Sequence, residues 1–238
     1  NIKYFSEKII YLPNTYQARD SSLKISDKIF KREELGLPKN AFVFCCFNQN
    51  NKITPNIFDI WMKILKTVDK SVLWLLEDDS IAVKNLRKEA KKRKIDPKRI
   101  IFAKRMPLAD HFARHKCADL FIDTFPYGAH TTCSDSLWAG LPIVTLMGKS
   151  FASRVASSLL NAINLEELVT STEKEYEKLI IELANNSYRL KEIRNKLHKN
   201  RSSKPLFDTK LYTKNIELAY TKIYEKHLNK LPAKNIDI

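Results

Sequence analysis

The chain has 238 residues, of which 44% are hydrophobic and 10% aromatic, so it can bury one large core or two small ones and is not disordered. No apolar run approaches the roughly 20 residues that span a bilayer, and residues 1–4 lack a signal-peptide pattern, so we expect a soluble chain without a membrane span. The formal net charge of +15 is compatible with acidic partners, nucleic acid among them.

Five short apolar runs are typical of strands that are buried on both faces. They are residues 42–47, 72–76, 100–102, 119–122 and 143–146. Helical patterns follow them at 55–68, 81–94, 107–116, 132–139 and 151–162. This alternation predicts an α/β fold, a Rossmann-like doubly wound parallel sheet with right-handed crossovers and helices on both sides.

Beyond Thr170 the pattern is wholly helical, over residues 173–184, 188–199 and 209–227, and we expect the tail from Leu231 to Ile238 to be frayed. The basic stretch at 84–105 alternates with apolar residues at helical spacing, which favours a solvated helix face over a nucleic-acid site. The four cysteines lie in apolar or helical patterns without zinc-ligand spacing, so we expect reduced core thiols and a cytoplasmic location.

Three loops that follow strands carry polar groups at the edge of the sheet where ligands bind in such folds. The first, at 47–52, delivers Gln49 and Lys52, and a lysine there can neutralise a diphosphate leaving group. A solvated loop lysine is the alternative. The second, at 104–111, leads into a helix that carries His111 and Arg114, and the imidazole of His111 can contact a base. Taken singly, a histidine at position 111 is more often a surface residue of a helix.

The loop after the fourth strand, residues 123–135, gives the strongest signal. Its glycine turn precedes His130, Thr131 and Thr132, where free N–H groups, two hydroxyls and a helix N-terminus favour phosphate oxygens. Asp135, one helical turn after Thr131, can accept hydrogen bonds from ribose hydroxyls. An N-cap threonine followed by a helical aspartate, without any ligand, is the alternative.

Other nucleotide motifs and a metal site find little support. The chain has four glycines and contains neither G-x-G-x-x-G nor a P-loop. The acidic run 77–79 fits the start of a helix better than a divalent metal site, because acidic side chains favour helix N-termini. We therefore expect no metal and no resident cofactor.

Six segments together resemble the O-GlcNAc transferase and SPINDLY family, glycosyltransferase family 41, whose bacterial members are joined to tetratricopeptide repeats. They are FNQxxK at 47–52, SVLWLL at 71–76, HTTxxD at 130–135, LWAG at 137–140, ASRVA at 152–156 and PLFDTK at 205–210. The resemblance implies a GT-B fold of two Rossmann-like halves, of which this chain is the nucleotide-sugar half. Residues 1–40 would link from the missing half, 41–204 would form the nucleotide-sugar-binding domain, and 205–238 the C-terminal helix and tail.

The same resemblance implies roles for the loop residues. Lys52 would contact the diphosphate with Gln49 beside it, His111 and Arg114 would lie near the base, His130, Thr131 and Thr132 would hold the phosphates, and Asp135 the ribose. The sequence departs from the family in two ways. Leu108 stands where the best-known members have a lysine, which removes one expected polar contact to the donor. No large inserted domain follows the segment 8–13, which favours a bacterial-type relative.

The implied reaction is metal-independent and inverting transfer of a GlcNAc-like sugar from a UDP-sugar to Ser or Thr of a protein. The general base would belong to the missing half, so this piece alone would show little or no turnover. GDP-fucose is the alternative donor, because Leu108 removes one polar contact that the family makes there. The rival interpretation is a non-catalytic module that senses a nucleotide sugar or holds nucleic acid on its basic surface.

Overall fold

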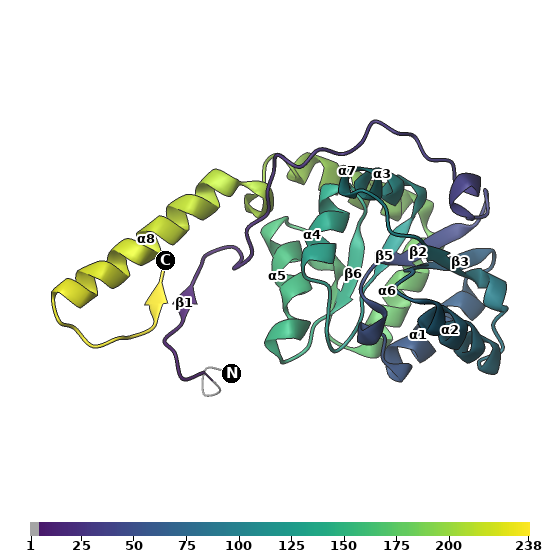
Figure 1. The fold of residues 1–238 in the computed structure, drawn as a ribbon, viewed down its shortest axis with the longest axis horizontal. Coiled ribbons are helices and arrows are strands. Elements are labelled where there is room, and N and C mark those ends of the chain that lie inside the picture. The colour runs from purple at the N-terminus through teal and green to yellow at the C-terminus, as the bar shows by residue number, and fades with distance from the viewer. Residues whose placement is uncertain (1–4) are drawn as a thin grey trace.

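The computed structural model describes residues 5–238, so the expectation for residues 1–4 lies outside it. The main strands are β2 Phe42–Cys46, β3 Ser71–Leu76, β4 Ile100–Ala103, β5 Leu120–Ile122, β6 Ile143–Leu146 and β7 Val169–Thr170. They pair in parallel in the order β4-β3-β2-β5-β6-β7, as Figure 1 shows for the centre of the sheet. The predicted parallel sheet is confirmed. It gains β7, which is too short to leave a pattern in the sequence.

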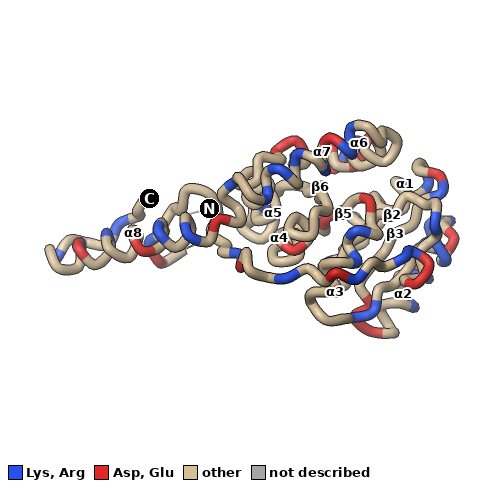
Figure 2. The backbone as a smooth tube through the Cα atoms, turned by 90° about the horizontal axis from the view of Figure 1, so that it is seen from above, with Lys and Arg blue, Asp and Glu red and all other residues tan. Residues whose placement is uncertain are grey.

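The helices follow the predicted alternation. They are α1 Pro55–Thr67, α2 Ser80–Lys92, α3 Leu108–Arg114, α4 Thr131–Trp138, α5 Val155–Ala162, α6 Glu173–Asn185, α7 Ser187–Asn200 and α8 Thr209–Leu228. Figure 2 shows α3 and α6 on opposite sides of the strands, as a doubly wound sheet requires. The helix expected at 107–116 ends in a 3-10 turn, His115–Cys117.

Local sequence explains where α2 begins and which face it exposes. Its N-cap is Asp79, whose Oδ1 accepts hydrogen bonds from the N–H groups of Ile81 and Ala82, so the acidic run starts a helix as predicted. Ala90 faces the core, whereas the lysines of α2 are exposed. Lys and Arg are spread over several elements with acidic residues between them (Figure 2). This distribution agrees with a solvated basic face.

The core lies on both faces of the sheet and is built by the strands and the inner sides of the helices. Phe44 of β2 and Trp74 of β3 are fully buried, and so is Trp61 of α1. Trp61 donates through Nε1 to the Tyr176 hydroxyl, which donates to the backbone carbonyl of Asp123. All four cysteines are buried free thiols, as the sequence predicted.

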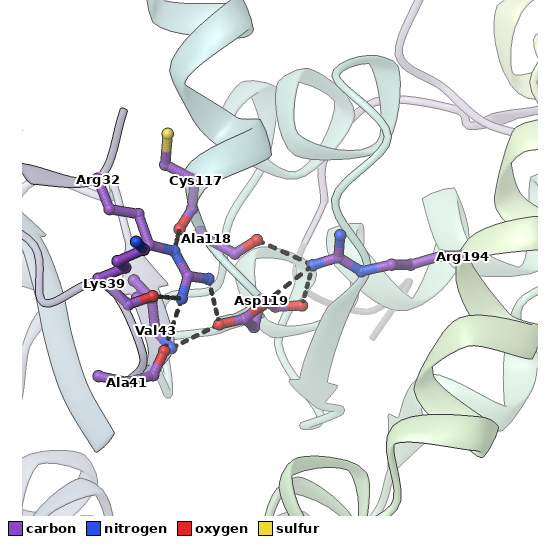
Figure 3. A network of polar contacts seen from close by, with 8 residues as sticks. All are labelled: Arg32, Lys39, Ala41, Val43, Cys117, Ala118, Asp119 and Arg194. Carbon is purple, nitrogen blue, oxygen red and sulfur yellow. Dashed lines mark hydrogen bonds and ion pairs between the residues drawn. The ribbon is translucent and has the colours of Figure 1, made fainter. Parts of the chain in front are cut away.

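An ionic network fastens the N-terminal segment to the amino-terminal edge of the sheet (Figure 3). Arg32 Nη2 lies 2.7 Å from Asp119 Oδ2, and the guanidinium also donates to the carbonyls of Cys117, Lys39 and Ala41. Arg194 of α7 approaches Asp119 from the other side, with Nη2 at 3.8 Å from Oδ1. One carboxylate thus joins three separate parts of the chain.

The expectation that residues 231–238 are frayed is wrong. Strand β8, Ile236–Asp237, pairs in parallel with β1, Ile10–Tyr11, and the Ile236 N–H donates to the Ile9 carbonyl at 3.0 Å. The pair lies beside α8, which projects from the body of the molecule (Figure 1). Two-residue strands give no periodic signal, and their partner is at the other end of the chain. No helix between residues 5 and 238 has the length and apolarity of a membrane span.

The strand order determines where a ligand fits. The chain runs from β2 outward through β3 to β4, then returns to the centre and runs the other way through β5, β6 and β7. β2 and β5 are therefore neighbours whose connections leave in opposite directions, which is the topological switch point of a doubly wound sheet. The loops after these two strands face each other across a crevice at their carboxyl ends.

A candidate nucleotide-binding site

A cavity of about 610 Å³ lies at this switch point. It is lined by all of the predicted site residues: Gln49, Lys52, His111, Arg114, His130, Thr131, Thr132 and Asp135. Three loops that are separate in the sequence meet there because the carboxyl ends of parallel strands share one edge. The structure therefore brings the predicted residues together, and their individual ligand contacts stay a prediction.

Lys52 lies beside the loop that follows β5. Its Nζ donates to the Gly128 carbonyl at 3.1 Å and lies 4.0 Å from the centre of the Tyr127 ring. Tyr127 stacks on the imidazole of His130, with ring centres 5.1 Å apart. Burial lowers the pKa of Lys52, and the nearby Asp123 opposes that shift. The ammonium is thus held at the cavity wall, close to the start of α4.

The start of α4 offers uncommitted donors. His130 is the N-cap residue, and its carbonyl accepts from the N–H groups of Cys133 and Ser134. Within the described part of the chain, the N–H groups of Thr131 and Thr132 have no acceptor. Free N–H groups at a helix N-terminus, together with a nearby ammonium, favour an anion such as a diphosphate.

A buried polar network beneath the cavity joins the loops after β2 and β5. Asn48 donates through Nδ2 to Asp123 Oδ1 at 3.0 Å and to the Thr124 hydroxyl at 2.8 Å, and its Oδ1 accepts from the Thr132 hydroxyl. Asp123 Oδ1 also accepts from the N–H of Ala129 at 2.8 Å. Burial raises the pKa of Asp123 to about 6, although these hydrogen bonds favour the carboxylate.

The opposite wall is aromatic and basic. Arg114 is 1% exposed, and its guanidinium lies 4.8 Å from the Phe47 ring centre and donates through Nη1 to the Lys104 carbonyl at 2.6 Å. Its Nε and Nη2 atoms are buried without a hydrogen-bond partner. Burial lowers the pKa of His111 to about 2, so this imidazole is neutral at physiological pH. A flat, neutral ring beside a guanidinium suits contact with a nucleobase.

The model of glycosyltransferase family 41 matches residues 18–216. The chain belongs to this family. Its fold also agrees with a solved structure of a mutant O-GlcNAc transferase from Thermobaculum terrenum, with a TM-score of 0.78 and 29% identity over 90% of this chain and 40% of that chain. The fold of Anabaena HepE, solved with UDP and glucose, is similar at a TM-score of 0.62 and 17% identity, over 88% and 56% of the two chains. The predicted family and GT-B fold class are confirmed.

Two relatives in family 41 show how much of a longer protein this chain represents. It is 37% identical to the probable UDP-N-acetylglucosamine–peptide N-acetylglucosaminyltransferase SEC of Arabidopsis thaliana, over 94% of this chain and 23% of the relative. It is 38% identical to the UDP-N-acetylglucosamine–peptide N-acetylglucosaminyltransferase of Caenorhabditis elegans, over 86% and 18%. The chain thus spans about a fifth of these relatives.

Sequence reasoning missed several residues of the site in this family 41 chain. Asn48 adjoins the predicted Gln49, so its place in the loop was a usable signal. Tyr127 lies inside the strongest motif, residues 123–135, but was not among the predicted site residues. His115 is buried, and its Nδ1 lies 2.7 Å from the His111 carbonyl. Arg19, which forms an ion pair with Asp135, had no signal at all, because only the fold brings them together.

Proposed function

We propose that this chain is the nucleotide-sugar-binding half of a glycosyltransferase that transfers a GlcNAc-like sugar from a UDP-sugar to Ser or Thr of a protein, with inversion and without a metal ion. The observation that carries the proposal is the placement of Lys52 and the free N–H groups of α4 around one cavity at the switch point. A diphosphate placed between them would be neutralised by groups that belong to this chain.

In the proposed reaction, an acceptor hydroxyl oxygen attacks the anomeric carbon of the donor sugar. The bond from that carbon to the diphosphate oxygen breaks, and the nucleoside diphosphate leaves with the electron pair. Lys52 and the Thr131 and Thr132 N–H groups stabilise the charge that grows on the leaving group, which is the role for which we call Lys52 catalytic. The hydroxyl proton passes to a general base in another part of the enzyme.

The remaining parts of the site would come from outside this chain. We propose that an N-terminal catalytic half supplies the base and the acceptor contacts, that tetratricopeptide repeats bind the protein acceptor, and that the enzyme works in the cytoplasm. The relatives' names specify transfer to a peptide, which supports a protein acceptor, and the chain spans only about a fifth of their length, which supports further catalytic parts. On α8, Tyr220 and Tyr224 are each 62% exposed, so this helix has apolar surface for such a partner.

Calorimetric titration of the 238-residue chain with UDP, UDP-GlcNAc, GDP and GDP-fucose tests the proposal. We expect UDP and UDP-GlcNAc to bind and the guanosine compounds to bind at least ten-fold more weakly. Lys52→Ala and Asp135→Ala should each weaken binding about ten-fold or more, whereas Lys88→Ala, which removes an exposed lysine of α2, should leave it unchanged. Addition of EDTA should have no effect.

Two results would reject the proposed function. If none of the four nucleotides binds while oligonucleotides bind with a steep salt dependence, the basic surface rather than the cavity is the functional site. If the guanosine compounds bind more tightly than the uridine compounds, the donor assignment is wrong. Leu108, which is 48% exposed at the cavity wall, is then the first position to examine.

A further inference from the structure

The segment that precedes the sheet contributes a charged side chain to the rim of the cavity. Arg19 Nη2 lies 2.5 Å from Asp135 Oδ1, and the two side chains are 10% and 11% exposed. The angles do not suit a hydrogen bond, so the contact is an ion pair. The guanidinium also lies 5.4 Å from the centre of the Phe112 ring on α3. Arg19 is thus enclosed between α3 and α4.

Further contacts hold the segment in this position. Gln17 Nε2 lies 3.5 Å from the Ser134 hydroxyl of α4, the Ser26 N–H donates to the Ala109 carbonyl at 3.0 Å, and Lys28 forms an ion pair with Asp110 at 2.6 Å. The segment therefore crosses the first turns of both helices that wall the cavity. A side chain fixed in this way is positioned before any ligand arrives.

We propose that Arg19 is a positioning residue of the nucleotide site, which keeps Asp135 as a carboxylate with one oxygen engaged by the guanidinium and the other left for ligand hydroxyls. This inference rests on the proposed function, because Asp135 is taken there as the ribose contact. The Oδ1 atom of Asp135 is buried against Arg19, and the same residue also lines the cavity, where a ligand would lie. An ionised carboxylate acts only as an acceptor at both oxygens, whereas a protonated carboxyl carries an O–H donor on one of them.

Charge balance around Asp135 supports this role. Burial raises the pKa of Asp135 to about 6, and Arg19 is the charged group that opposes the shift. Cys133 on α4 interacts with Asp135, and the basic titratable groups that line the same cavity are Lys52, Arg105, His111, Arg114 and His130. Burial raises the pKa of the Cys133 thiol well above its usual value and lowers that of His111 to about 2, so both are neutral near pH 7.

The ionisation of Asp135 can be measured without any ligand. Carbon-detected NMR of the side-chain carboxyl groups, followed from pH 4 to pH 9, gives the pKa of Asp135 in the wild-type chain, Arg19→Met and Arg19→Lys. We expect Arg19→Met to raise the pKa of Asp135 by about one unit or more and Arg19→Lys to restore it to near the wild-type value. Arg87→Met, which removes an arginine that covers the Phe102 ring, is the matched control and should change nothing.

The second readout is UDP affinity across the same pH range. At pH 7, Arg19→Met should bind UDP about two- to ten-fold more weakly than the wild type and should approach it at pH 9, since the carboxylate then forms without help. In an Asp135→Asn background, Arg19→Met should cause no further loss. The pKa of Asp123 is also about 6, so the UDP affinity of the wild type can change with pH through either carboxyl group. The effect of Arg19 is therefore taken from the difference in affinity between Arg19→Met and the wild type at each pH.

An unchanged Asp135 pKa in folded Arg19→Met would overturn the inference, whatever happens to stability. Folding of each variant is checked by thermal unfolding, and if Arg19→Met does not fold, Arg19→Gln takes its place in both measurements. Failure of the wild-type chain to bind UDP would reject the proposed function, while the NMR titration would still decide whether Arg19 sets the charge of Asp135. The two hypotheses are therefore tested separately.

Discussion

Asn48 and Thr132 join the two loops that flank the switch point, because the Thr132 hydroxyl donates to Asn48 Oδ1. The Asn48 amide is oriented by Asp123 and Thr124, both of which accept from its Nδ2. The proton of the Thr132 hydroxyl is thus committed to Asn48. The donor that Thr132 can offer to a phosphate is its backbone N–H, and its hydroxyl has a positioning role.

We expect Asn48→Ala to lower the free energy of unfolding by about 1–3 kcal/mol, because it leaves buried polar groups without partners. It should also weaken UDP binding about ten-fold, equivalent to about 1.4 kcal/mol, since the start of α4 loses its tie to the loop after β2. Urea unfolding and calorimetry measure the two effects. Asn85→Ala, at an exposed position of α2, is the control. Unaltered UDP affinity in Asn48→Ala would show that the tie does not shape the site.

Because the pKa of Asp123 is raised in the folded chain, we expect its contribution to the free energy of unfolding to decrease as pH rises. Its pKa is about 6 in the folded chain, above its ordinary value, so the folded state holds more protons than the unfolded state between these values. Relative to Asp123→Asn, the wild type should therefore lose up to about 3 kcal/mol of unfolding free energy from pH 4 to pH 7. Urea unfolding at several pH values measures this difference. Asp69→Asn, at an exposed position, is the comparison variant.

For His115 we expect the opposite dependence of the free energy of unfolding on pH. Burial lowers its pKa to about 4, so its contribution to stability is present above the unfolded value of about 6.5 and is lost as pH falls toward 4. The wild type should lose up to about 3 kcal/mol relative to His115→Gln over that range. Exposed His198→Gln serves for comparison. Parallel pH profiles for wild type and His115→Gln would contradict the prediction.

We expect substitutions in the ionic network at Asp119 to lower the free energy of unfolding without changing the affinity for UDP. Arg32→Met removes one ion pair from Asp119 and the guanidinium that donates to three backbone carbonyls, so we expect a loss of about 2 kcal/mol in unfolding free energy. Arg194→Met should cost less, because its ion pair with Asp119 is longer, at 3.8 Å. UDP affinity, measured by calorimetry, should stay within two-fold of the wild type. A large loss of affinity in Arg32→Met would mean that the two edges of the sheet are coupled.

The sequence was sufficient for the elements with a strong local signal. Strands such as Val72–Leu76 are unbroken apolar runs, and capping residues such as Asp79 mark where helices begin. The site residues could be grouped because parallel strands place their following loops at one edge. This grouping required only the order of the elements, and the cavity lining agrees with it.

What the sequence could not supply depends on contacts between distant segments. Arg19 meets Asp135, and β1 meets β8, only because the chain folds back on itself. Neither short strand has a periodic pattern, and an isolated arginine in a linker has no motif. The same holds for His115, whose burial beneath the cavity wall follows from packing on Phe47, with ring centres 5.1 Å apart.

The ionic network and the cavity lie at opposite edges of the same sheet, and this separation bears on how such enzymes diversify. Asp119 joins the amino-terminal edge to Arg32 and Arg194, so part of the stability of the sheet comes from contacts far from the exposed positions of the cavity wall. We therefore expect replacements at exposed positions of the cavity wall, such as Leu108, to leave the chain folded. Exposed positions at the carboxyl-terminal edge can therefore change without loss of the ionic network at the amino-terminal edge. Libraries of variants restricted to these exposed positions should yield mostly folded proteins.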